Sequence, residues 1–307
     1  MADEQDILKR PPPQTPPRHT SRRIGIHTST SGGPETAAER AYRLGCNAFQ
    51  IFSSSPREWA PAVLSAAQRE AMRRLRAQYD LKPLVIHANY LVNLAGANPD
   101  FYKKSVLAFR GEVERAVALG AEFLVLHPGS FRGLTREEGL IRAAAGVATA
   151  VESVPGHEAV TVLIENTAGS EFSLGGSFEQ VAELVAKLAP HIRVAACIDT
   201  CHTHVAGYDI VTVAGYEQTL AQLDATVGLA NVPVWHCNDA KAERGSHLDR
   251  HQHIGKGTIG LELFRRLLND PRLARAAFIA ETPIDEPGDD LRNVAALKAL
   301  VARSPSV

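Results

Sequence analysis

The chain has 307 residues, 45% of them hydrophobic, and its 33 basic and 34 acidic side chains give a formal net charge of −1. A chain of this length can bury one large hydrophobic core or two smaller ones. Because the net charge is close to zero, binding of nucleic acid through overall charge alone is excluded, although a local positive site is not.

The sequence shows no run of about 18 apolar residues, which a membrane-spanning helix needs, and its first residues do not follow the pattern of a signal peptide. The four cysteines, Cys46, Cys197, Cys201 and Cys237, are too few for a disulfide framework in a chain of this length. We therefore expect a cytoplasmic protein with reduced thiols, associated with the nucleoid if the source is bacterial.

The first segment, residues 1–21, has five prolines between Pro11 and Pro17 and few apolar side chains. Such a segment cannot bury enough apolar surface to fold by itself. We predict a disordered, proline-rich leader over residues 1–21 and a single domain over residues 22–307.

From Arg22 onward, short apolar runs alternate with longer segments of helical spacing. Strands are expected at residues 23–28, 47–52, 84–87, 122–127, 160–165, 193–199, 232–236 and 276–281. Helices are expected between them, among others at residues 35–44, 66–79, 100–119, 136–151, 178–188, 261–268 and 293–302. Eight consecutive βα units predict an α/β fold, a single (β/α)8 TIM barrel rather than a doubly wound sheet.

Six of the expected strands close on a residue that can bind a metal ion. These residues are His87, His127, Glu165, Asp199, His236 and Glu281. In a TIM barrel the C-terminal strand ends surround the active site, so six such side chains should converge there. A single histidine at a strand end is more often an ordinary core residue, but six together favour a metal site, because buried carboxylates are rare unless paired or metal-bound.

Three more side chains of the same kind follow these strands. His202 comes three residues after Asp199, and Asp249 and His251 lie beyond the seventh strand. Nine ligands exceed what one ion takes, so we expect two or three ions and a bridging carboxylate. Imidazole-rich sites favour Zn²⁺ over Mg²⁺ or Ca²⁺, while Mn²⁺ can share such ligands, and the resulting positive charge would attract a phosphate diester.

These residues lie in longer segments that carry a family resemblance. The segments are HANYLVNLA (87–95), LHPGS (126–130), IENTAG (164–169), CIDTCHTHVAGYD (197–209), HCNDAK (236–241) and DRHQHIGKG (249–257). In them the chain resembles the endonuclease IV family (AP endonuclease family 2), metal-dependent endonucleases that act at apurinic/apyrimidinic (AP) sites in base-excision repair. The resemblance covers nearly the whole chain after the leader.

The resemblance implies a cluster of three zinc ions per chain, with Glu165 and Glu281 as catalytic residues. One ion would be held by His87, His127 and Glu165, a second by Glu165, Asp199, His236 and Glu281, and the third by His202, Asp249 and His251. A metal-bridging hydroxide would hydrolyse the phosphodiester bond 5′ to the AP site, leaving a 3′-hydroxyl and a 5′-deoxyribose phosphate.

The resemblance also implies contacts to double-stranded DNA with abasic sites. Arg57, Tyr90 and Leu91 match positions that enter the DNA stack when the abasic nucleotide is extruded. Without the resemblance these would be taken as surface and packing residues. A monomer is expected, since a long duplex needs open access to the barrel, and no membrane partner is expected.

Two features of the sequence depart from the family pattern. Ser170 and Glu171 follow the IENTAG segment where Gln-Gly is common, and Lys256 stands where glutamate is frequent. The added negative and positive charges near a phosphate-binding mouth can offset each other. They bear on substrate preference or metal affinity, because no ligand position is missing.

Two other functions remain open. A sugar isomerase or epimerase on the same barrel needs one divalent ion, and four of the nine residues, Glu165, Asp199, His236 and Glu281, would satisfy it while leaving the other five unexplained. A protein that binds abasic DNA without cutting it would have no need of nine ligands.

Overall fold

The computed structural model describes residues 7–11, 13, 17, 20–59 and 63–302. Its centre is a barrel of eight parallel strands: β1 (Arg23–Ile26), β2 (Phe49–Phe52), β3 (Leu84–His87), β4 (Phe123–Leu126), β5 (Thr161–Glu165), β6 (Val194–Asp199), β7 (Val234–His236) and β10 (Ala277–Ala280). They are hydrogen-bonded in the order β1-β10-β7-β6-β5-β4-β3-β2. Thr28 N donates to Gln50 O at 2.8 Å and Asn47 N to Ile24 O at 3.0 Å, so β1 and β2 close the ring. The predicted TIM barrel is confirmed.

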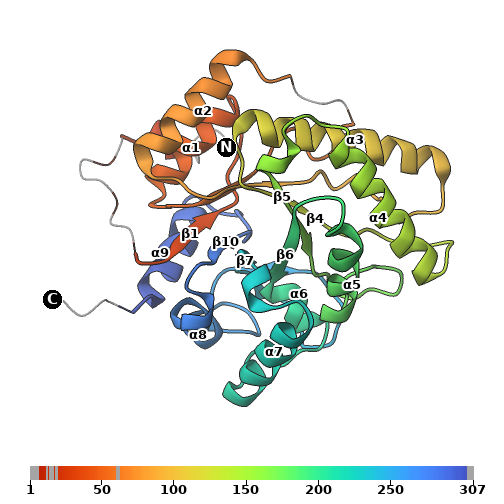
Figure 1. Ribbon diagram of the computed structural model, residues 1–307. Coiled ribbons are helices and arrows are strands. Elements are labelled where there is room, and N and C mark those ends of the chain that lie inside the picture. The colour runs from red at the N-terminus through yellow and green to blue at the C-terminus, as the bar shows by residue number, and fades with distance from the viewer. Residues whose placement is uncertain (1–6, 12, 14–16, 18–19, 60–62, 303–307) are drawn as a thin grey trace.

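Helices surround these strands (Figure 1). They are α1 (Pro34–Arg43), α2 (Ala66–Tyr79), α3 (Pro99–Leu119), α4 (Arg136–Glu152), α5 (Phe178–Leu188), α6 (Thr200–Val205), α7 (Val213–Thr226), α8 (Leu261–Asn269) and α9 (Asp289–Leu300). Short 3-10 turns lie at η1 (Ile7–Lys9), η2 (His157–Ala159), η3 (Leu229–Asn231) and η4 (Pro271–Leu273). Among the described residues no helix has the length and apolar character to cross a bilayer.

Local sequence signals explain where several helices begin. Ser65 with Gln68 and Thr135 with Glu138 form capping boxes at the starts of α2 and α4, in which each side chain binds the other residue's backbone N–H. Asp199 ends β6 and caps α6, because its carboxylate accepts the His202 N–H at 2.8 Å. A strand therefore turns directly into a helix at this point of the barrel mouth.

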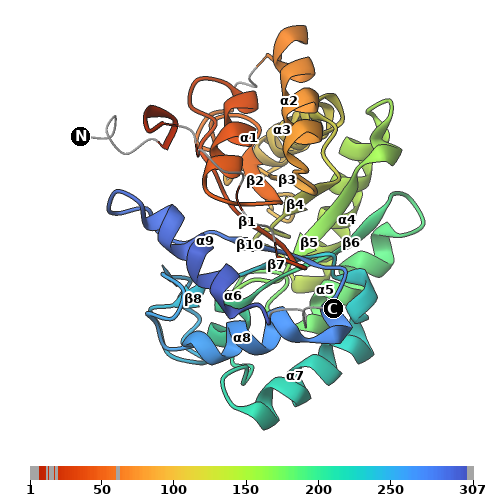
Figure 2. The ribbon, with the colours of Figure 1, turned by 90° about the vertical axis from the view of Figure 1, so that its left-hand side faces the viewer.

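Part of the leader packs against the barrel wall. η1 lies beside α1, and Arg43 Nη1 donates to the carbonyls of Leu8 at 3.2 Å and Arg10 at 2.8 Å. Figure 2 shows η1, the short dark red turn, beside α1. Much of residues 1–21 lies outside the described residues, so disorder of the leader as a whole stays a prediction.

Candidate metal centre

Strand alternation directs a ring of polar side chains into the mouth of the barrel. The barrel interior is filled by an apolar layer that includes Ala48, Val85, Val125, Leu163, Cys197, Val234 and Ile279. Because side chains alternate along a strand, the residue two positions later points to the same interior. Those residues are Gln50, His87, His127, Glu165, Asp199, His236 and Glu281. The six strand-end ligands predicted from the sequence thus share one layer, together with a glutamine that the prediction did not include.

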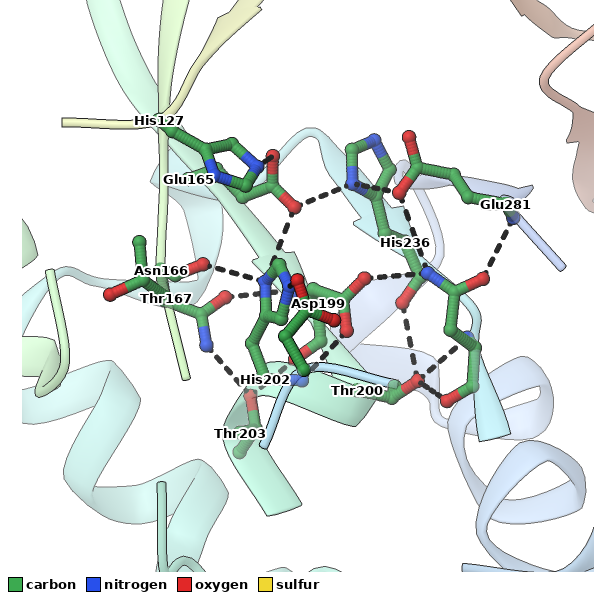
Figure 3. A network of polar contacts seen from close by, with 12 residues as sticks. His127, Glu165, Asn166, Thr167, Asp199, Thr200, His202, Thr203, His236 and Glu281 are labelled. Atoms are coloured by element: carbon green, nitrogen blue, oxygen red, sulfur yellow. Dashed lines mark hydrogen bonds and ion pairs between the residues drawn. The ribbon is translucent and has the colours of Figure 1, made fainter. Parts of the chain in front are cut away.

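Glu165 lies at the centre of this ring and is fully buried. Its Oε2 is 3.2 Å from His87 Nε2 and 3.0 Å from His127 Nε2. Its Oε1 is 2.9 Å from His236 Nδ1 and 3.5 Å from His202 Nδ1. Figure 3 shows the carboxylate between imidazoles of different strands. The two oxygens face separate groups of ligand-type residues, which is the arrangement a bridging carboxylate requires.

The remaining residues gather around Glu165 in two further groups. His236 Nδ1 lies 3.2 Å from Glu281 Oε2, and ligand atoms of Glu165, Asp199, His236 and Glu281 all lie within 4.8 Å of one another. The ligand atoms of His87, His127 and Glu165 also lie within 4.8 Å of one another, and so do those of His202, Asp249 and His251. The structure therefore brings together the members of each of the three groups that the family resemblance implies. Their binding of metal stays a prediction.

A small hairpin positions the two ligand-type residues that come from outside the barrel. β8 (Asp239–Ala240) pairs antiparallel with β9 (His251–Gln252), with Ala240 opposite His251. This pairing brings Asp249 over the mouth, where its Oδ2 lies 3.2 Å from His202 Nε2 and its Oδ1 lies 3.3 Å from His251 Nε2. The hairpin itself was not predicted.

The imidazole rings are oriented as metal ligands usually are. Nδ1 of His87, His202 and His251 donates to the backbone carbonyls of Ala88, Asn166 and Glu281 at 2.8, 2.9 and 3.1 Å. Each ring then presents Nε2 to the carboxylates, and backbone carbonyls commonly fix metal-binding histidines in this way. Nε2 of His251 is buried and faces Asp249 Oδ1 at 3.3 Å and Asp199 Oδ2 at 3.7 Å. The donor set therefore fits transition-metal ions.

The charges of the cluster strongly perturb its titration. Burial by itself lowers the pKa of His202, but Asp199, Asp249 and Glu165 outweigh it and raise the pKa to about 10. Burial likewise lowers the pKa of His251, yet Asp199 and Asp249 raise it to about 9. Burial raises the pKa of Asp249, but hydrogen bonds from the two histidines hold that pKa far below its usual range. Without a metal, the carboxylates of the site therefore keep His202 and His251 protonated.

Cys201 also comes within reach of this cluster. Its ligand atom lies within 4.8 Å of those of Asp199 and His251. Burial raises the pKa of the Cys201 thiol, and its Sγ donates to the Arg250 carbonyl at 3.8 Å. Cys201 is thus a small buried residue that borders the cluster, and its thiol is bonded to a backbone carbonyl.

Two amide side chains tie the ligand-type residues to one another. Gln50 Nε2 donates to Glu281 Oε1 at 2.5 Å, and Gln50 Oε1 accepts from His236 Nε2 at 2.8 Å. Asn238 Nδ2 donates to Asp199 Oδ2 at 2.6 Å, and Asn238 Oδ1 accepts the Glu281 N–H at 2.7 Å. Sequence reasoning missed both amides because they are not ligand types, although Gln50 lies two residues after the inward-facing Ala48.

The predicted DNA-contact residues lie on the loops after β2 and β3. Arg57 is exposed, Tyr90 is 67% exposed, and Leu91 is partly buried. The Tyr90 ring packs edge-on against Phe52 with centroids 5.0 Å apart and lies 5.9 Å from the ring of His87. These loops therefore adjoin the ligand ring, while their contact with DNA stays a prediction.

The residues that depart from the family pattern lie at the surface. Ser170 and Glu171 are exposed after β5, and Lys256 is exposed after β9. Their effects on substrate preference stay predictions.

The chain is similar in sequence and in fold to known proteins. Residues 38–301 match a family described as xylose isomerase-like TIM barrel. A probable endonuclease 4 of Solibacter usitatus is 52% identical over 281 residues, covering 91% of this chain and 96% of that protein. A probable endonuclease 4 of Chloroflexus aggregans is 41% identical over 281 residues, covering 91% and 98%. The crystal structure of endonuclease IV from Thermus thermophilus aligns with a TM-score of 0.82 at 40% identity, covering 91% and 98%.

Proposed function

Because the chain belongs to the endonuclease IV family, we propose that it is a metal-dependent DNA-repair endonuclease of base-excision repair. Its relatives support a nuclease with a metal cofactor and a DNA substrate. In this proposal the enzyme hydrolyses the phosphodiester bond 5′ to an AP site in duplex DNA and leaves a 3′-hydroxyl and a 5′-deoxyribose phosphate.

The observation that carries the proposal is the position of Glu165 between two sets of imidazoles. We assign one ion to Glu165 with His87 and His127. We assign a second ion to Glu165, Asp199, His236 and Glu281, and a third ion to His202, Asp249 and His251. When bound, such ions activate water near neutral pH and stabilise negative charge on the phosphate. The imidazole-rich donor set favours three Zn²⁺ ions per chain, with Mn²⁺ accepted at one or more positions.

The remaining roles are performed by side chains of the chain itself. Glu165 and Glu281 are assigned as catalytic residues because both lie in the layer that faces the reacting phosphate. Arg57, Tyr90 and Leu91, on the rim beside that layer, fill the space that an extruded abasic nucleotide leaves in the duplex. Open loops on this rim suit a monomer acting on a long duplex.

An incision assay with metal analysis tests the proposal. Purified protein is incubated with an end-labelled duplex that carries one tetrahydrofuran abasic analogue, and metal content is measured on the same sample. We expect a single cut 5′ to the analogue, a 3′ end that a DNA polymerase extends, and close to three metal ions per chain. The same duplex without the analogue should stay intact.

Other outcomes identify the rival functions. Tight binding of the abasic duplex, with the strand intact after prolonged incubation with Zn²⁺, would show a binding protein that does not cut. One metal ion per chain, no incision, and conversion of a ketose would show a sugar isomerase or epimerase, whose needs Glu165, Asp199, His236 and Glu281 alone would satisfy.

A further inference from the structure

Asn89 is a buried amide that bonds two neighbouring loops at the rim of the barrel. It follows β3 and is 6% exposed, whereas the adjacent Tyr90 is 67% exposed. Its Nδ2 donates to the carbonyl of Ser55 at 3.1 Å and to that of Glu58 at 2.9 Å. Its Oδ1 accepts the backbone N–H of Leu91 at 2.7 Å. One side chain thus holds both the loop after β2 and the turn after β3.

The bonded carbonyls flank Arg57 in the loop after β2. Within residues 53–59, one backbone hydrogen bond closes this loop on itself, from Glu58 N to Ser55 O at 3.3 Å. A cleft of about 350 Å³, lined by Trp59, Asn89 and Leu107 among others, lies between the middle of the loop and α3. The two ends of the loop do contact α3, because Ser53 hydrogen-bonds Glu112 and Arg115, and the Trp59 ring packs edge-on against Phe101 with centroids 5.3 Å apart. Between these two ends the loop has limited packing against α3, and there the Asn89 amide holds it through the carbonyls of Ser55 and Glu58.

An asparagine suits this position because its amide combines donors and an acceptor in one plane. The two donors reach the carbonyls of the first loop while the acceptor fixes the turn that carries Tyr90 and Leu91. Aspartate would keep the acceptor and lose the donors. Alanine would lose all three bonds.

We propose that Asn89 is a positioning residue that holds Arg57 in a fixed relation to Tyr90 and Leu91, so that the two loops meet DNA as one unit. This inference rests on the DNA-contact role assigned above to those three residues. Without Asn89 the loops must be ordered during DNA binding, and that cost enters KM while the chemical step is spared.

The test compares Asn89→Ala and Asn89→Asp with Asn47→Ala. Asn47 is a matched control, since it is also a buried amide that accepts from Ile24 N at 2.6 Å and donates to Arg22 O at 3.0 Å. These bonds lie at the N-terminal ends of β1 and β2, away from the mouth of the barrel. For the abasic-analogue duplex we expect KM to rise roughly tenfold in both Asn89 variants, kcat to change less than about threefold, and Asn47→Ala to keep wild-type KM.

Amide hydrogen exchange provides a second measurement that does not depend on incision. The Glu58 amide, whose N–H bonds Ser55 O within the loop, should exchange roughly tenfold faster in both Asn89 variants than in wild-type protein, and at the wild-type rate in Asn47→Ala. A wild-type KM and exchange rate in Asn89→Asp would overturn the proposal, as would an equal rise in KM in Asn47→Ala. If wild-type protein does not incise, the proposed function fails, and the exchange rates alone then decide whether Asn89 couples the loops.

Discussion

The Nε2–H of His236 donates to Oε1 of Gln50 at 2.8 Å, which leaves Nδ1 of His236 facing Glu165 and Glu281. The same glutamine donates from Nε2 to Glu281 at 2.5 Å. A neutral side chain thus selects the tautomer of one ligand-type residue and restrains the carboxylate of another. Groups that orient metal ligands in this way contribute measurably to metal affinity.

Replacing Gln50 by leucine should therefore weaken metal binding. We expect roughly tenfold to a hundredfold lower affinity, because His236 loses its partner and Glu281 becomes free to rotate. Competition with a chromogenic chelator measures the change. The exposed Gln222→Leu variant is the control, and unchanged metal affinity in Gln50→Leu would contradict the ordering role.

Glu165→Ala should abolish most incision and leave the barrel folded. Both carboxylate oxygens face imidazoles, so their loss removes the shared ligand of two ion positions. We expect kcat to fall about a thousandfold or more, with fewer metal ions per chain and an unchanged far-ultraviolet circular dichroism spectrum. Near-wild-type cleavage would reject the assignment, and the exposed Glu114→Gln variant controls for loss of a carboxylate elsewhere.

The barrel and most of the ligand ring were predictable because both depend on local periodicity. A strand of alternating pattern directs every second side chain inward, so His87, Glu165 and Asp199 end their strands on the inner face as predicted. His127 and Glu281 lie one residue beyond β4 and β10, since those strands end slightly earlier than expected. The shift leaves both side chains in reach of the cluster.

What the sequence did not reveal depends on contacts between distant segments or on weak periodicity. The two-residue strands of the β8–β9 hairpin are too short to produce a pattern, although their pairing brings Asp249 and His251 to the mouth. α6 is buried on every side and so lacks an amphipathic stripe. α7 contains Gly215, a poor helix former, near its start.

The histidines of the third group should make metal binding release protons. His202 and His251, with pKa values raised to about 10 and about 9, carry protons at pH 7 in the metal-free protein. An ion must displace both protons to reach the lone pairs, so filling this group at pH 7 should release roughly two protons and weaken as pH falls. Calorimetry in buffers of different ionisation enthalpy counts them, and release of none would contradict the assignment.

The same shifts predict how the stability of metal-free protein depends on pH. A histidine whose folded pKa is raised above 6.5 contributes stability that is fully present below pH 6.5 and is lost as pH rises through the folded value. The Tm of metal-free protein should therefore fall between about pH 7 and pH 10, whereas metal-loaded protein should change less. Thermal unfolding across this pH range, with and without Zn²⁺, measures the difference. An equal change of Tm with pH in both samples would count against the prediction.

Replacing Arg57 or Tyr90 by alanine should weaken binding of abasic DNA and leave metal content unchanged. Both side chains are exposed on loops beside the ligand ring, and the Tyr90 ring contacts Phe52 rather than a carboxylate. Loss of a side chain that stacks into DNA typically costs about 1–3 kcal/mol, which predicts roughly tenfold to a hundredfold weaker binding. Fluorescence anisotropy with a labelled abasic-analogue duplex measures the affinity, and Arg74→Ala on the exposed face of α2 is the control. A fall in bound metal in Tyr90→Ala would place this residue in the metal centre instead of at the DNA interface.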